Sequence, residues 1–344
     1  MKPSIILGIE SSCDDTSSAI ISGRKILSNV AATQAIHNEY GGVVPELASR
    51  AHQQNIIPVV EHAIRTANIQ QKDICAIGFT RGPGLLGSLL VGTSFAKSLA
   101  MSLAVPLIEV NHLQAHILAH FIEDANPVPP QFPFLCLTVS GGHTMIVLVK
   151  DYFDMEIIGK TIDDAAGEAF DKIGKIFNLD YPAGPIIDQK AQTGNPEAFQ
   201  FSQPKISGYD YSFSGIKTSV LYFIQKEIRK NPNFIAEHLN DLCASVQSCI
   251  VTVLMQKLKK AAQDLNIKEV AIAGGVSANS ALRTAMQEAA QKYGWNIYIP
   301  KFEYTTDNAA MIALVAQLKY EKGQFTDLKT TATARYSLDD SLHF

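Results

Sequence analysis

Short apolar runs alternate with longer amphipathic segments along most of the chain, which is the pattern of an α/β protein. Strands are predicted where apolar residues stand together between turn residues, and helices where apolar residues recur every three or four positions. The predicted strands cover residues 5–9, 18–21, 74–80, 106–110, 134–140, 145–149, 268–273 and 295–299. The predicted helices cover residues 44–67, 88–104, 280–293 and 309–320, and Pro58 should divide or kink the first of them.

The order of these elements occurs twice. In each half a hairpin with a polar tip, at residues 10–17 and 140–144, precedes a strand, a glycine-rich loop, a helix and a return strand. This repeat predicts a duplicated α/β fold with two lobes, a largely parallel sheet in each, and a central cleft where the loops converge. We place the N-terminal lobe at residues 1–110 plus about 308–338, and the C-terminal lobe at 111–307, with a mainly helical insertion at about 150–267.

Composition narrows the class of protein. The 344 residues, 47% of them apolar and 18% charged, are enough for about two domains with real cores. A net charge of −4 argues against a chain that grips nucleic acid unaided, because phosphate neutralisation needs concentrated Lys and Arg. The five scattered cysteines form no C-x-x-C pair, and we find no apolar run of about 18 residues. We therefore expect a cytoplasmic protein that is not inserted in a membrane.

Two histidines provide the first candidate chemistry. His112 and His116 stand four residues apart in a helical pattern, so they share one face and can both reach a metal ion at about 2.1 Å. Asp307 follows the return strand of the second repeat, and a pseudo-twofold would place it across the cleft from the histidines. Two histidines and a carboxylate leave coordination positions open, as a catalytic metal requires. The alternatives are ordinary buried histidines and an N-cap role for Asp307, and His120 could extend the series or face outward.

Other polar segments carry weaker signals. The glycine turns at residues 140–143 and 274–279 let backbone amides approach an anion, but such turns are common and neither matches a P-loop or dinucleotide fingerprint. Glu10, Asp14 and Asp15 form an acidic tip that either positions a cation or an amine, or is a solvated turn. A helix-capping role accounts for the acidic side chains at residues 163–164, but it does not account for the carboxylate of Asp171.

Taken together, the motifs resemble a known family. They are Gly8-Ile9-Glu10-Ser11-Ser12-Cys13-Asp14-Asp15-Thr16, Gly42 to Arg50, Gly82-Pro83-Gly84-Leu85, Asn111 to His116, Ser140-Gly141-Gly142-His143-Thr144, Asp164 to Lys172, Ser212 to Thr218 and Gly274 to Asn279. Over nearly its whole length the chain resembles the bacterial tRNA N6-adenosine threonylcarbamoyltransferase family, which has the duplicated actin/Hsp70/sugar-kinase (ASKHA) fold.

The resemblance implies an acyltransferase. The donor would be threonylcarbamoyl-AMP, and the acceptor the N6 amine of the adenosine 3′ of the anticodon in tRNAs reading codons that begin with A. One iron or zinc ion would be held by His112, His116 and Asp307. Asp14 matches an acidic position of the family that is tied to activity, and our own hypothesis is that it orients or deprotonates the amine. The donor would contact Thr138, Val139, Ser140, Gly141, Gly142, Asp171, Gly184, Asp188 and Asn279. Ala183, and Leu113-Gln114-Ala115, depart from the common family pattern.

The resemblance also implies partners besides tRNA. They are a paralogous partner of the same fold without the metal site, a small ATPase and a synthase that supplies the donor. Modification by the isolated chain is therefore expected to be weak.

Two alternatives remain. A phosphotransferase of the same fold would hold Mg²⁺ with carboxylates and waters and has no need of the histidine pair. A metalloprotease of the zincin type needs Glu directly after the first histidine, where this chain has Leu113.

Overall fold

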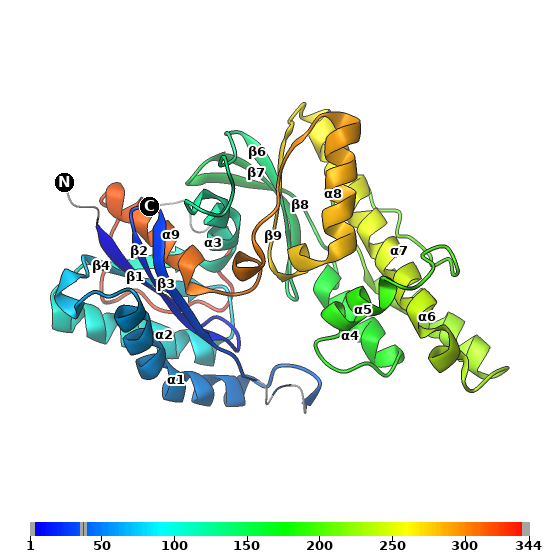
Figure 1. The fold of residues 1–344 in the computed structure, drawn as a ribbon, viewed down its shortest axis with the longest axis horizontal. Coiled ribbons are helices and arrows are strands. Elements are labelled where there is room, and N and C mark those ends of the chain that lie inside the picture. Colours follow the sequence, from blue (N-terminus) through cyan, green and yellow to red (C-terminus); the bar gives the residue numbers. More distant parts are fainter. Residues whose placement is uncertain (1–3, 35–36, 38–39, 339–344) are drawn as a thin grey trace. The chain divides into compact units, whose positions relative to one another are not determined.

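The computed structural model describes residues 4–34, 37 and 40–338. The chain divides into two compact units, which are described separately. The first unit comprises Met1–Pro129, Tyr152–Met155 and Pro300–Phe344, and the second comprises Pro130–Asp151 and Glu156–Ile299. Each unit is built around one five-stranded sheet with helices packed on it (Figure 1).

The first unit holds β1 (Ile5–Glu10), β2 (Thr16–Ser22), β3 (Lys25–Ala32), α1 (Pro45–Thr66), β4 (Ala76–Gly82), α2 (Leu86–Leu103), β5 (Leu107–Asn111), α3 (His112–Leu118) and α9 (Ala309–Glu321). The second unit holds β6 (Phe134–Val139), β7 (Thr144–Asp151), α4 (Ala166–Ile176), α5 (Ala183–Ala191), α6 (Ser214–Ile228), α7 (Phe234–Asp264), β9 (Glu269–Ala273), α8 (Ser280–Tyr293) and β10 (Asn296–Tyr298). Strand β8 (Asp154–Lys160) begins in the first unit and continues in the second. Short 3₁₀ helices lie at Gln71–Asp73, Ala119–Phe121, Gly275–Ala278 and Phe302–Tyr304.

The two sheets share one topology. Their strand orders are β3-β2-β1-β4-β5 and, read from the other edge, β8-β7-β6-β9-β10. In the first sheet β1 pairs antiparallel with β2 and parallel with β4, and in the second β6 pairs antiparallel with β7 and parallel with β9. The predicted duplication is confirmed, but the prediction of largely parallel sheets is wrong because each sheet is mixed. The sequence pattern missed β3 and β8, whose half-exposed positions interrupt the apolar runs.

Helices cover both faces of the first sheet (Figure 1). Leu7, Ile77 and Phe79 share a core with residues of α1 and α2. Gly8 and Gly78 point the other way, because successive residues of a strand face opposite sides, and they lie directly under Ala313 and Ala316 of α9. Ala309 to Lys319 are all buried, so α9 is the central helix of that layer.

Two helices of the first unit differ from expectation. Pro58 lies within α1, which continues through it as one helix. Helix α2 is the one helix among the described residues that is long and apolar enough to cross a membrane, although the sequence predicted no such segment. It packs against α1 and β4, and Leu89 and Ala96 on its inner side are fully buried. This packing is that of a helix covering a sheet.

The unit boundaries also differ from the predicted lobes. Residues 111–129 and 300–307 were assigned to the C-terminal lobe, but both segments belong to the first unit. Asp124 joins them, because it accepts hydrogen bonds from Lys301 Nζ at 2.6 Å and from Tyr304 Oη at 2.9 Å. Helix α3, which lies within residues 111–129, also packs against α9 of the first unit.

Candidate metal centre and substrate loops

Helix α3 presents two histidines on one face, as predicted. Asn111 caps the helix, with its side-chain oxygen accepting hydrogen bonds from the backbone N–H groups of Leu113 and Gln114. His112 and His116 are both buried, and their ring centroids lie 4.7 Å apart with perpendicular planes. His120 lies beyond the end of α3 and outside this group, and Asn126 Nδ2 donates to its Nδ1.

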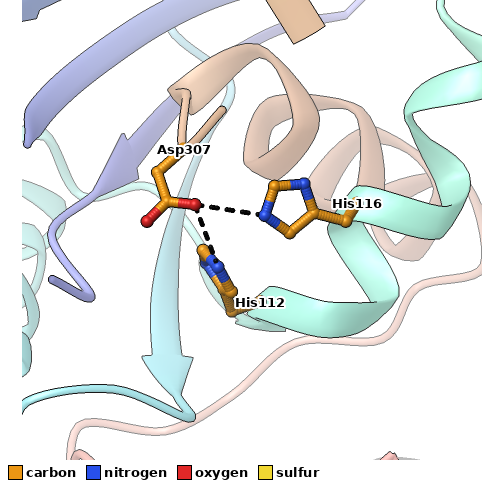
Figure 2. A group of neighbouring side chains, drawn as sticks. All are labelled: His112, His116 and Asp307. Carbon is orange, nitrogen blue, oxygen red and sulfur yellow. Dashed lines mark hydrogen bonds and ion pairs between the residues drawn. The ribbon is translucent and has the colours of Figure 1, made fainter. Parts of the chain in front are cut away.

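Asp307 lies immediately before α9, and Figure 2 shows its carboxylate facing both imidazoles. One oxygen, Oδ1, is 3.3 Å from His112 Nε2 and 3.1 Å from His116 Nε2. The N-cap role belongs to the next residue, because Asn308 Oδ1 accepts the hydrogen bond from Met311 N–H. The alternative reading of Asp307 as a helix cap is therefore wrong, and its carboxylate is free to serve as a ligand.

The three residues come from one unit. The sequence placed Asp307 across a cleft from the histidines, and that placement is wrong, because residues 300–344 belong to the first unit with α3. Asp307 reaches the histidines because α9 lies on the first sheet beside α3.

The geometry of the group fits one metal ion. One ligand atom from each residue lies within 4.8 Å of the other two. Ligand atoms of a tetrahedral ion with bonds of about 2.0–2.1 Å are about 3.3 Å apart, close to the 3.1 and 3.3 Å between Asp307 Oδ1 and the two Nε2 atoms. Three protein ligands leave a position open for a substrate atom. Imidazole and carboxylate together suit iron or zinc better than Mg²⁺.

The charges of the group are strongly coupled. Burial opposes the ionised form of Asp307, but the positive charge of His112 and hydrogen bonds from both histidines lower its pKa. Burial likewise opposes the charged form of His112, but the carboxylates of Asp307 and Glu10 raise its pKa well above the usual value. Burial lowers the pKa of His116. Without an ion, a positive charge on His112 and the negative charge of Asp307 therefore stabilise each other.

Sequence reasoning did not connect Glu10 to this group. Glu10 ends β1 and is fully buried, and its Oε2 lies 2.9 Å from His112 Nδ1. The available signal was a carboxylate at the end of a buried strand, which sequence analysis assigned only to an acidic tip.

The acidic tip lies between β1 and β2. His52, fully buried on α1, holds it by donating from Nε2 to the Cys13 carbonyl at 3.0 Å, and its Nδ1 lies 2.7 Å from Thr16 Oγ1. Burial, with the negative charges of Asp14 and Asp307, raises the pKa of Asp15 to about 7. Asp15 therefore exchanges a proton near neutral pH.

The predicted donor-binding residues of the second unit gather around the end of β6. Thr138 and Val139 are buried in that strand, and the turn that follows is closed by a hydrogen bond from Ser140 N–H to the His143 carbonyl at 2.8 Å. A side chain at Gly167 would lie 2.6 Å from the Ser140 carbonyl, so the first turn of α4 packs directly on this turn. A side chain at Gly274 would lie 2.5 Å from the Val139 carbonyl, which brings the loop before α8 to the same place.

The other predicted donor-binding residues make hydrogen bonds at the first turns of helices in this unit. Asp171 accepts a hydrogen bond at 2.8 Å from the backbone N–H of Ala183, next to Gly184, and its burial raises its pKa. Asp188 accepts two hydrogen bonds from Ser280, one from its N–H at 3.0 Å and one from its hydroxyl at 2.6 Å. Asn279 caps α8 and donates to Gln247 Oε1 at 2.7 Å. Each of these side chains thus has a structural partner already.

Comparison with known proteins identifies the family. Residues 25–314 match the model of the tRNA N6-adenosine threonylcarbamoyltransferase family. The chain belongs to this family. A relative of that name from Riemerella anatipestifer is 84% identical over 98% of this chain and 99% of its own length. Another, from Christiangramia forsetii, is 62% identical over 96% of this chain and 97% of its own length.

Solved structures show the same fold at low identity. HypF of T. kodakarensis matches with a TM-score of 0.60 and 13% identity over 96% of this chain and 50% of that chain. Component A of the (R)-2-hydroxyglutaryl-CoA dehydratase of Acidaminococcus fermentans matches with a TM-score of 0.52 and 15% identity over 92% of this chain and 99% of that chain. The expected ASKHA fold class is confirmed.

Family membership confirms the predicted activity. The protein is a transferase that attaches the threonylcarbamoyl group to N6 of adenosine in tRNA. The phosphotransferase and metalloprotease alternatives receive no support from the relatives. The family and the His112–His116–Asp307 group are compatible with a bound metal ion.

Proposed function

We propose that His112, His116 and Asp307 hold one iron or zinc ion, and that this ion is the centre of the transfer reaction. The convergence of the three ligand atoms, which all lie within 4.8 Å of one another, carries the proposal. The two histidines lie on one buried helix face, which pre-orients them before the ion binds.

The donor in this proposal is threonylcarbamoyl-AMP, bound by the second unit. The amides of Ser140, Gly141 and Gly142 lie in an open turn, where side chains at the two glycines would meet nothing within 4 Å. Thr138, Val139, Asp171, Gly184, Asp188 and Asn279 complete the donor-binding set. Backbone N–H groups and helix starts suit the phosphate of such a ligand.

The acceptor in this proposal is the adenosine 3′ of the anticodon in tRNAs that read codons beginning with A. The donor is a mixed anhydride, so AMP leaves readily, whereas the adenine amine is a poor nucleophile because its lone pair is delocalised. A bound ion would supply a Lewis acid and a template for the carbamoyl carbonyl. Asp14 orients or deprotonates the amine, and His52 fixes the loop on which Asp14 stands.

Partners complete the reaction. With a net charge of −4 the chain needs help to hold tRNA, so we place it with a paralogous partner of the same fold, a small ATPase and a synthase that makes the donor. All of these act in the cytoplasm, where tRNA is modified. Robust turnover by the isolated chain with only donor and tRNA would contradict the need for partners.

Metal content and transfer can be measured on the same variants. Purified wild-type protein should carry about one equivalent of iron or zinc, and His116→Ala and Asp307→Asn should lose it together with threonylcarbamoyl transfer in the reconstituted system, read by nucleoside mass spectrometry. His120→Gln is the matched buried-histidine control and should keep the ion. Full metal occupancy in Asp307→Asn would refute the proposed centre.

A further inference from the structure

Glu10 was predicted only as part of an acidic tip, but in the structure its carboxylate contacts the candidate metal centre. Its side chain is fully buried, and three donors surround the carboxylate. Thr80 Oγ1 donates to Oε2 at 2.8 Å, and the backbone N–H of Ser12 donates to Oε1. His112 Nδ1 is the third, 2.9 Å from Oε2. The carboxylate is therefore anchored by β4 and by the start of the loop, and its remaining contact is a candidate metal ligand.

The two histidines differ in this respect. The Nδ1 atom of His112 faces Glu10, whereas the Nδ1 atom of His116 is buried without a hydrogen-bond partner among the residues that the structure describes. Both Nε2 atoms face Asp307. A ring whose far nitrogen is held by a carboxylate has a fixed orientation and a fixed tautomer, and its ligating nitrogen is more basic.

We propose that Glu10 is a positioning residue of the metal centre, which holds His112 as the Nδ1–H form so that the Nε2 lone pair points at the ion. This inference rests on the proposed metal centre. Glu10 thereby raises the affinity for the ion. The His112 ring is already oriented, and its proton is already on Nδ1, when the ion binds to Nε2. The fixed donors from Thr80 and Ser12 prevent the carboxylate from turning away from His112.

The surrounding donors determine the result of Glu10→Gln. The buried N–H of Ser12 needs an acceptor, so the amide oxygen of Gln should replace Oε1. The NH₂ group then takes the place of Oε2 and donates to His112 Nδ1, which favours the Nε2–H form that cannot bind an ion through Nε2. Glu10→Ala is less informative, because Ser12 Oγ lies 3.2 Å from His112 Nδ1 and could replace the carboxylate as acceptor.

Zinc affinity, measured by competition with a chromophoric chelator at one pH, tests the inference. Glu10→Gln should bind zinc about 10–100-fold more weakly than the wild type. Glu109→Gln is the matched control, since Glu109 is a buried carboxylate of the same unit that pairs with Arg81 at 2.7 Å, and its zinc affinity should stay within about twofold of wild type. Equal affinity of Glu10→Gln and wild type would refute the role of Glu10 and leave the metal centre intact. A wild-type protein that binds no zinc would refute both.

A second measurement needs no Glu10 variant and remains decisive if Glu10→Gln does not fold. In zinc-loaded wild type labelled with ¹⁵N-histidine, the ring of His112 should show a metal-bound Nε2 and a slowly exchanging proton on Nδ1. The resonance is assigned by its loss in His112→Gln. Zinc on Nδ1, or an Nδ1 proton that exchanges as fast as that of an exposed histidine, would overturn the inference.

Discussion

Replacing Gly8 with alanine should disturb both the first sheet and the metal centre. Gly8 lies on β1 beneath α9, where an added Cβ would stand 2.7 Å from the Ala309 carbonyl oxygen and from the Ala313 nitrogen, and 2.8 Å from the Ala313 Cβ. Two of these atoms belong to the backbone, so no rotamer change can relieve the clash. Helix α9 must therefore move away from β1.

The size of the effect follows from these distances. Ordinary contacts of this kind are about 3.5–4 Å, so the helix must move by about 1 Å, and over-packing of this kind costs about 1–3 kcal/mol. With an m-value of about 2 kcal/mol/M in urea, the midpoint of the first unit should fall by about 0.5–1.5 M. Asp307 is separated from α9 only by the N-cap Asn308 and should move with the helix, and a shift of about 1 Å exceeds the tolerance of about 0.2 Å for metal–ligand distances. Zinc affinity should therefore fall by more than about tenfold.

The assay must report on the first unit, because two units need not unfold together. The single tryptophan, Trp295, lies in the second unit, so its fluorescence would not report the first. Amide hydrogen exchange of β1 and α9 across a urea series, with zinc affinity on the same samples, measures the two effects directly. Gly215→Ala on α6 is the control, since its Cβ would meet nothing within 4 Å and should cost no stability. Unchanged exchange and unchanged zinc affinity in Gly8→Ala would refute the reasoning.

Three further predictions concern charge and capping. Neighbouring carboxylates raise the pKa of His112 against the effect of burial, so protons compete with the ion for its Nε2. The zinc affinity of the wild type should therefore keep rising with pH above about 6.5. A zinc affinity that is constant above that pH would contradict this prediction. Asp15, with a pKa of about 7 when folded and about 3.9 when unfolded, contributes stability below about pH 4 that is lost as pH rises through 7. Asp15→Asn should therefore have a higher urea midpoint than wild type at pH 8, and parallel pH profiles of the two proteins would refute this. Asp188→Ala removes both hydrogen bonds from Ser280 and should destabilise the second unit by about 1–3 kcal/mol, measured by Trp295 fluorescence in urea, and an unchanged midpoint would exclude this capping role.

Much of the architecture could be predicted from local patterns. Apolar runs located eight of the ten strands found among the described residues, and the recurrence of hairpin, strand, loop, helix and strand revealed the duplication. The strands that were missed, β3 and β8, have exposed positions along their length, so their hydrogen bonds to β2 and β7 identify them where the pattern does not. The family motifs then led to the activity that the relatives confirm.

The candidate metal centre was likewise predictable from the sequence in part, and the tertiary structure decided the rest. That His112 and His116 share a face follows from helix geometry over four residues, so the sequence was sufficient to pair them. Asp307 stands 191 residues beyond His116, and only the packing of α9 on β1 and α3 brings it to them, in the first unit and with Asn308 as the cap. Glu10 joins the site for the same reason, since its contact with His112 spans 102 residues. Contacts of this range depend on which helix covers which face of a sheet, and this is decided by the packing of the whole unit.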